Sequence, residues 1–152
     1  MTLDAGEWIE REVDGAFRVV GSKPVMVAQY LWGQGPPAEG GRGDPSMWIV
    51  PPVEQYRSDY GLSLPADYLP EANGAHYLVI ARPRGSWVAI DGVGIPGTLG
   101  GTVGDWDVGV IPAEAGVHQV LGAQPFSLVT IGMADYTSYA TPGGRDLRPI
   151  LR

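Results

Sequence analysis

The chain has 152 residues, enough for one domain with a buried core, and carries a formal charge of −7. This charge argues against a nucleic-acid partner, which would need a basic patch, and the lack of cysteine excludes disulfides and thiolate metal sites. No apolar run approaches the length of a membrane span, and the N-terminus shows no signal-peptide pattern, so we expect no membrane insertion.

The first part of the chain is predicted to form short strands separated by glycine- and proline-rich turns. Polar and apolar residues alternate over 7–13, which predicts a half-exposed strand. Asp14-Gly15 is a hairpin signal that leads to a second strand over 17–20, and a longer strand is expected over 25–32. The glycine- and proline-dense segment 33–45 is predicted to be a surface loop.

The loop contains the tripeptide Arg42-Gly43-Asp44, which some adhesion receptors read. A three-residue match arises easily by chance, and here a proline follows it directly. We therefore interpret the tripeptide as a chance match.

Three strands are predicted in the middle of the chain. The first covers 46–50, and the segment 53–60 after it is compatible with one helical turn or with an irregular strand. Residues 76–82 form a continuous apolar run typical of a buried strand. A turn at 83–85 is expected to pair this strand with 86–90.

The next predicted strand faces the core through Trp106, Val108 and Val110, which alternate with polar or small residues. A strand over 117–121 follows, and residues 122–125 are predicted to close a hairpin.

The strand after this turn is predicted to organise the fold, because apolar residues point to both of its sides. Phe126, Leu128 and Thr130 share one face, and Val129, Ile131 and Met133 share the other. A tyrosine-rich segment over 135–139 and a turn at 142–144 are expected to form a hydrogen-bonding exit loop.

No segment keeps a helical periodicity, so the predicted fold is all-β. We expect residues 1–152 to form a single two-sheet β-sandwich, jelly-roll-like, with inward-facing residues from both sheets. Its predicted core contains Val27, Ile49, Val79, Ile80, Val88, Val110, Val120, Leu128 and Ile131.

An internal similarity connects residues 15–25 with residues 116–126, with Gly, Val, Gly and Pro at four equivalent positions. A chance likeness between two β-hairpins is one explanation. We favour a duplicated hairpin, which implies two related hairpins in the sandwich.

Several short motifs in a fixed order make the chain resemble the N-terminal domain family of the IgGFc-binding protein, especially its bacterial members. These motifs are Gly43-Asp44-Pro45-Ser46-Met47, Pro52-Val53-Glu54-Gln55-Tyr56, Val88-Ala89-Ile90-Asp91-Gly92, Ala115-Gly116-Val117-His118, Pro125-Phe126, Tyr136-Thr137-Ser138-Tyr139 and Pro142-Gly143-Gly144. The resemblance extends over about residues 17–147, which look like the later part of the family domain.

This resemblance implies a secreted or surface-displayed β-rich module of a large multidomain protein, without catalysis. It supplies no binding residues that carry over to this chain.

The residues themselves also favour a non-catalytic protein. There is no cysteine nucleophile and no G-x-S-x-G motif, and the two histidines, His76 and His118, lie far apart in the sequence. We expect both to be half-exposed residues of strands.

Asp105 and Asp107 flank Trp106 and are predicted to lie on one strand face beside a glycine-rich loop. Alternate carboxylates could hold Ca²⁺ through oxygen ligands. The other interpretation, which we favour, is a solvated strand face.

The five tryptophans and seven tyrosines are mostly expected in the core. Trp8, on one face with Glu10 and Glu12, is the best candidate for an exposed binding ring. Tyr136 and Tyr139 are further candidates for binding, although we favour a role in which their hydroxyls hold a loop.

The sequence thus predicts an extracellular adhesion or protein-interaction module. The alternative is a carbohydrate-binding module that uses exposed aromatic rings, with or without Ca²⁺. Self-association through strand edges is a third expectation.

Overall fold

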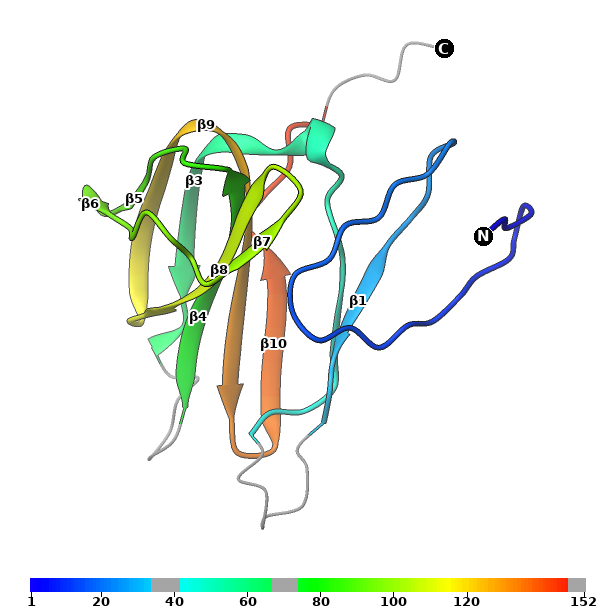
Figure 1. Cartoon of the computed structure of the whole chain (residues 1–152). Coiled ribbons are helices and arrows are strands. Elements are labelled where there is room, and N and C mark those ends of the chain that lie inside the picture. Colours follow the sequence, from blue (N-terminus) through cyan, green and yellow to red (C-terminus); the bar gives the residue numbers. More distant parts are fainter. Residues whose placement is uncertain (34–41, 67–73, 148–152) are drawn as a thin grey trace.

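The structure, a computed structural model, describes residues 1–33, 42–66 and 74–147 and confirms an all-β sandwich (Figure 1). The strands are β1 (Ala28–Leu31), β2 (Ser46–Ile49), β3 (Arg57–Leu64), β4 (Ala75–Pro83), β5 (Val88–Ile90), β6 (Val93–Gly94), β7 (Gly101–Val103), β8 (Trp106–Ala113), β9 (Gly116–Ala134) and β10 (Thr137–Pro142). A 3₁₀ turn, η2 (Val53–Gln55), precedes β3, so the segment 53–60 contains both a helical turn and a strand.

Strand β9 organises the fold, because it has 19 residues and belongs to both layers of the sandwich. Its first half pairs with β3 and β5, and its second half pairs with β4 and β10, all antiparallel. Figure 1 shows β9 arching over the top of the molecule between the two layers. The remaining ladders extend the layers, since β5 pairs with β6, β4 with β8, and β8 with β7.

The predicted hairpin turn at 122–125 is wrong. These residues stay within β9 and form its bend, where the register against β3 jumps between Arg57, opposite Phe126, and Asp59, opposite Leu121. A strand that passes from one sheet to the other needs such an irregularity, because extra residues on one strand bend it sharply.

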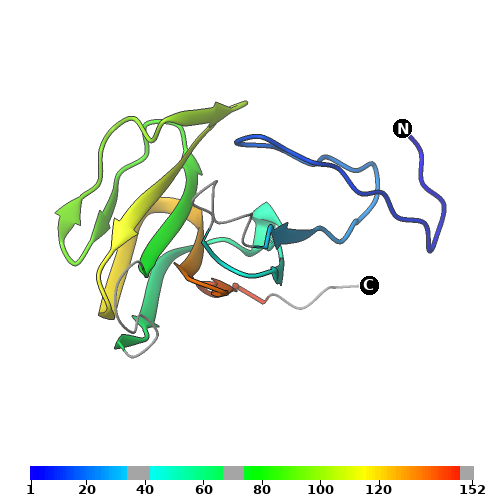
Figure 2. The same cartoon turned by 90° about the horizontal axis from the view of Figure 1, so that it is seen from below.

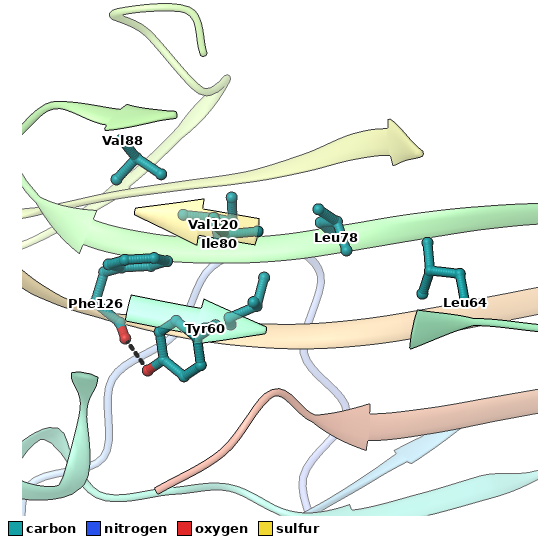
Figure 3. Packing of buried hydrophobic residues seen from close by; sticks show 8 residues of the cluster. Tyr60, Leu64, Leu78, Ile80, Val88, Val120 and Phe126 are labelled. Atoms are coloured by element: carbon teal, nitrogen blue, oxygen red, sulfur yellow. Dashed lines mark hydrogen bonds between the residues drawn. The ribbon is translucent and has the colours of Figure 1, made fainter. Parts of the chain in front are cut away.

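The main core lies between the two layers. Every second residue of β4 is buried, from His76 to Arg82, and Leu78 and Ile80 are its apolar members. Figure 3 shows this cluster from close by, and it consists of Tyr60, Leu64, Leu78, Ile80, Val88, Val120, Phe126 and Leu128. The rings of Tyr60 and Phe126 pack edge to face with centroids 5.0 Å apart, and the Tyr60 hydroxyl donates a 2.5 Å hydrogen bond to the Phe126 carbonyl.

A second cluster lies on the outer face of the layer formed by β4, β9 and β10, under the two-stranded sheet of β1 and β2. Trp48 packs there with Val129 and Ile131, and Leu31 contributes from β1. The prediction that the strand after Pro125 is covered on both faces is therefore confirmed, with the same residues on each face.

Strand β5 does not pair with β4, which corrects the hairpin expected between 76–82 and 86–90. The neighbours of β4 are β8 and β9, whereas β5 lies beside β9 in the other layer. The turn between them, in which the Ser86 N–H donates to the Pro83 carbonyl, carries the chain across the sandwich.

The predicted inward face of β8 is also wrong. Asp107 and Gly109 point inward, and Val110 is exposed. A Cβ atom at Gly109 would lie 2.4 Å from the Leu99 carbonyl oxygen, so the segment through Leu99 occupies the space that an inward valine would need. Of the other predicted core residues, Ile80, Val88, Val120, Leu128 and Ile131 are buried, and Val27, Ile49 and Val79 are half-buried.

The strands predicted over 7–13 and 17–20 are absent. The duplicated hairpin expected from residues 15–25 and 116–126 is therefore wrong, because the first segment forms no strand and the second is one continuous part of β9. Residues 1–26 form no ladder and are all exposed, and only the last part of the predicted strand 25–32 pairs, as β1. We call residues 1–27 the N-terminal arm; Figure 2 shows the arm extending away from the sandwich. Alternation alone does not make a strand, because the backbone groups also need a neighbouring strand to bond with.

Candidate functional site

The outer face of the β1–β2 sheet carries a row of exposed apolar side chains. Tyr30 of β1 and Met47 of β2 are paired across the ladder and are 62% and 54% exposed. Trp32, two residues beyond Tyr30, is 76% exposed, and Met26 is exposed on the other side of the row. We call these four residues the apolar row. Exposed apolar residues that gather on one surface mark an interaction site more often than apolar residues that are exposed singly.

A groove of about 390 Å³ lies between β3 and β10 at an open side of the sandwich. Residues 61–63 and Pro65 line one side of it, Tyr139 and residues 141–143 line the other, and Thr130 contributes from β9. We call this feature the β3–β10 groove. The Thr130 hydroxyl donates to the Thr141 carbonyl at 3.1 Å, which holds β10 against β9.

Tyr139, a predicted binding residue, contributes its ring to this groove. Its hydroxyl oxygen lies 2.8 Å from Nδ1 of His76. His76 is buried on the inner face of β4, so the prediction of a half-exposed histidine at this position is wrong. The ring covers Gly132, where a Cβ atom would lie 2.1 Å from the Tyr139 Cε1. The sequence did suggest a hydroxyl that holds structure in place, but not that a histidine on β4 would be its partner.

The other two aromatic candidates lie apart from Tyr139. Trp8 is exposed in the N-terminal arm, as expected, and Tyr136 is exposed in the turn between β9 and β10 with a positive φ of 56°. The expectation that most aromatic rings lie in the core is wrong for the tryptophans, since Trp8, Trp32 and Trp87 are exposed. The structure does not bring the three predicted binding residues together in one site.

Asp105 and Asp107 do not share a strand face. Asp105 is exposed in the turn before β8, whereas Asp107 is buried on β8. The Asp107 Oδ2 accepts a 3.0 Å hydrogen bond from the Gly85 N–H and lies 4.0 Å from the Arg82 Nε. Within residues 1–33, 42–66 and 74–147, no three His, Cys, Asp or Glu side chains gather closely enough to hold a metal ion.

The second histidine, His118, contacts an acidic group. Its Nδ1 lies 2.7 Å from the Asp91 Oδ2, and its Nε2 lies 2.9 Å from the Glu114 carbonyl. The Asp91 Oδ1 also accepts the Gln119 N–H at 2.8 Å. These contacts connect the β5–β6 turn to the start of β9, so His118 has a structural role here.

The contact between His118 and Asp91 predicts a pH-dependent stability. The hydrogen bond to Asp91 raises the pKa of His118, so its stabilising effect is complete below about 6.5 and is lost as the pH rises through the folded-state pKa. The N–H of Gln119, and then His118, lower the pKa of Asp91, so its effect is present above about 4 and is lost in acid.

The stability difference between wild type and His118→Gln should therefore be largest between about pH 4 and 6.5 and smaller at pH 8.5. Urea unfolding of both proteins across this range measures it. Asp91→Asn serves as the reciprocal variant, because asparagine tolerates the φ of 50° at this position. A difference that does not change with pH would contradict the prediction.

The tripeptide Arg42-Gly43-Asp44 lies against the β9–β10 hairpin. The Gly43 N–H donates a 2.8 Å hydrogen bond to the Ala134 carbonyl, and the Asp44 carbonyl accepts a hydrogen bond from the Ser138 hydroxyl. Gly43 is buried and has a φ of 102°. Gly43 and Asp44 therefore serve as structural contacts of the β9–β10 hairpin.

Comparison with known proteins gives one finding. The family model described as IgGFc binding protein matches residues 1–132. No curated protein and no solved structure matches the chain. Among the described residues, no helix has the length and apolar character to cross a membrane.

Proposed function

Because the chain belongs to the IgGFc-binding protein family, we propose that it is a non-catalytic protein-interaction module of an extracellular or cell-surface protein. The family model covers residues 1–132 and therefore includes the N-terminal arm, β1 and β2. Membership supports a protein as the partner, since the family is described by binding and not by a reaction.

The observation that carries this proposal is the apolar row on the β1–β2 sheet. Its residues Tyr30, Trp32 and Met47 are more than half exposed, although the opposite face of the same sheet buries Trp48. Aromatic residues and methionine are enriched in protein interfaces, because large rings and flexible thioethers contribute much contact area. A partner that covers the apolar row would remove this surface from water.

The first partner to test is the Fc fragment of IgG, which the family's description names. Surface plasmon resonance with immobilised Fc is expected to show saturable binding, with Fab as the negative control. Trp32→Ser is expected to weaken the affinity by at least about tenfold, equivalent to about 1.4 kcal/mol.

Trp87→Ser is the matched control, because Trp87 is also exposed but lies between β4 and β5. This variant should bind as the wild type does. Equal affinities for wild type and Trp32→Ser would refute the apolar row as the interface, and absent wild-type binding would eliminate Fc as the partner.

A further inference from the structure

Residues 15–25 of the N-terminal arm have the sequence of a buried strand but lie in solvent. They align with residues 116–126, the first half of β9, in which Val120 and Phe126 are completely buried. The equivalent residues of the arm, Val19 and Val25, are 54% and 58% exposed. Residues 15–25 of the arm thus expose the side chains whose equivalents in β9 are buried in the core.

The equivalent segment of β9 also shows which strand this sequence pattern pairs with. Residues 116–121 of β9 pair with β3 in an antiparallel ladder from Leu64, opposite Gly116, to Asp59, opposite Leu121. Val120 lies opposite Tyr60 in this ladder. The pattern shared by the two segments is therefore one that pairs with β3.

The other edge of β3 is available for such pairing. Among the described residues, the ladder with β9 is the only one that β3 forms. Residues 61–63 border the β3–β10 groove on this side. The arm of the same chain lies on the far side of the sandwich, beside β7, where a Cβ atom at Gly101 would lie 3.7 Å from Ala16 (Figures 1 and 2). The arm that reaches this edge must therefore come from another chain.

Charge favours the same contact. Residues 15–25 contain Arg18 and Lys23 and no acidic residue, whereas all 17 acidic residues lie in the rest of the chain. A second copy of this chain thus offers a basic, apolar, extended segment to a predominantly acidic molecule. The residues that line the β3–β10 groove carry no charge, so this attraction acts over long range on the rate of association and not within the groove.

We infer that the β3–β10 groove binds residues 15–21 from the arm of a second copy, which adds as a strand to the free edge of β3. The backbone of the arm supplies the ladder hydrogen bonds, as in other cases of strand addition. Phe17 and Val19 lie on one side of the added strand and enter the groove, whereas Arg18 and Val20 point away from it.

The test uses two variants of the full chain that damage opposite partners of the contact. Val19→Asp places a charge on the arm, and Gly61→Arg places one in the groove, where a Cβ atom would meet no other atom within 4 Å. Light scattering coupled to size-exclusion chromatography over a range of concentrations should show the wild type rising from monomer towards dimer mass. Each variant alone should associate at least about tenfold more weakly.

An equimolar mixture of the two variants should regain association. The intact arm of the Gly61→Arg chain then meets the intact groove of the Val19→Asp chain. Val93→Asp is the matched control, because Val93 is exposed on β6 and lies in neither the arm nor the groove, so this variant should associate as the wild type does. Thermal unfolding of all variants at low concentration verifies that the monomers are folded.

A synthetic peptide of residues 15–25 gives a second measurement. Added to the Val19→Asp chain, it should shift the amide NMR signals of residues 61–63 and 141–143, and the same peptide with Val19→Asp should not. A wild type that stays monomeric at every attainable concentration would overturn the inference. A mixture that associates no better than its components, or peptide-induced shifts confined to other surfaces, would also overturn it.

Discussion

Replacing Phe126 with alanine is expected to lower the free energy of unfolding by about 3–5 kcal/mol, the largest loss that we expect from a single apolar residue. Phe126 is completely buried between the two layers and lies where β9 leaves its bend. Its ring packs edge to face on the Tyr60 ring. It also lies close to Gly122, where an added Cβ atom would be 2.7 Å from the Phe126 Cδ1. The alanine would leave a cavity at the one point where both layers are covalently connected through β9.

Urea unfolding followed by tryptophan fluorescence measures this loss, because the chain has five tryptophans. The control is Phe17→Ala, which removes the only other phenylalanine, a residue of the N-terminal arm that is 36% exposed. This variant should change the free energy of unfolding by less than about 0.5 kcal/mol. Similar losses in the two variants would show that the core does not lie between the layers.

Arg82→Met is expected to cost about 3–5 kcal/mol, because it leaves Asp107 as a buried charge without its cation. Arg82 is 2% exposed on the inner face of β4. Its Nη2 donates to the carbonyls of Pro96 and Gly97 at 2.6 and 2.8 Å, and these bonds hold the segment before β7 over the inner face. Arg82→Lys should also be destabilising, since one ammonium does not reproduce the geometry of the planar guanidinium.

A double-mutant cycle with Asp107→Asn separates the charge from the packing. If the two groups are coupled, the double variant should lose less than the sum of the single losses, by about 0.5–3 kcal/mol. Arg84→Met is the matched control, because Arg84 is exposed and its Nη2 donates to the Gly104 carbonyl at 2.5 Å. Additive losses, or an Arg84→Met loss as large as that of Arg82→Met, would contradict this account.

The two proposals concern different surfaces, so they fail separately. Tyr30 and Met47 of the apolar row lie on β1 and β2, with Met26 and Trp32 just before and after β1, whereas the β3–β10 groove lies at the opposite side of the layer that contains β10. Trp32→Ser should leave self-association intact, and Gly61→Arg should leave Fc binding intact. If two copies exchange arms, the resulting dimer carries two apolar rows. Two linked binding surfaces raise the effective concentration of the second one for a multivalent partner.

The strands in the interior could be predicted from the sequence, and those at the periphery could not. Residues 76–82 and 126–133 are apolar at consecutive positions, and such runs are stable only when both faces are covered. The alternation over 7–13 and the hairpin signal before 17–20 also predict strands, but no ladder forms in either segment. A strand needs backbone partners, and their presence depends on residues far away in the sequence.

The residue pattern also predicted the wrong inward face for β8. The apolar residues Trp106, Val108 and Val110 suggested one face, but the buried Arg82 requires Asp107 on the inner side of the neighbouring strand, where the two residues are paired in register. A buried guanidinium costs free energy unless a carboxylate or carbonyl accepts its hydrogen bonds. This requirement outweighs the burial of one valine.

By itself, the sequence determined the all-β class, the central two-faced strand after Pro125 and the family, because these depend on local composition and on motifs in a fixed order. Only the tertiary structure decided that residues 122–125 bend one strand across two layers, that the apolar row lies in solvent and that β3, among the described residues, pairs with β9 alone. Strand pairing is the physical reason for this division. Its hydrogen bonds join segments distant in the sequence, and the chain's own periodicity does not reveal which edge each segment meets.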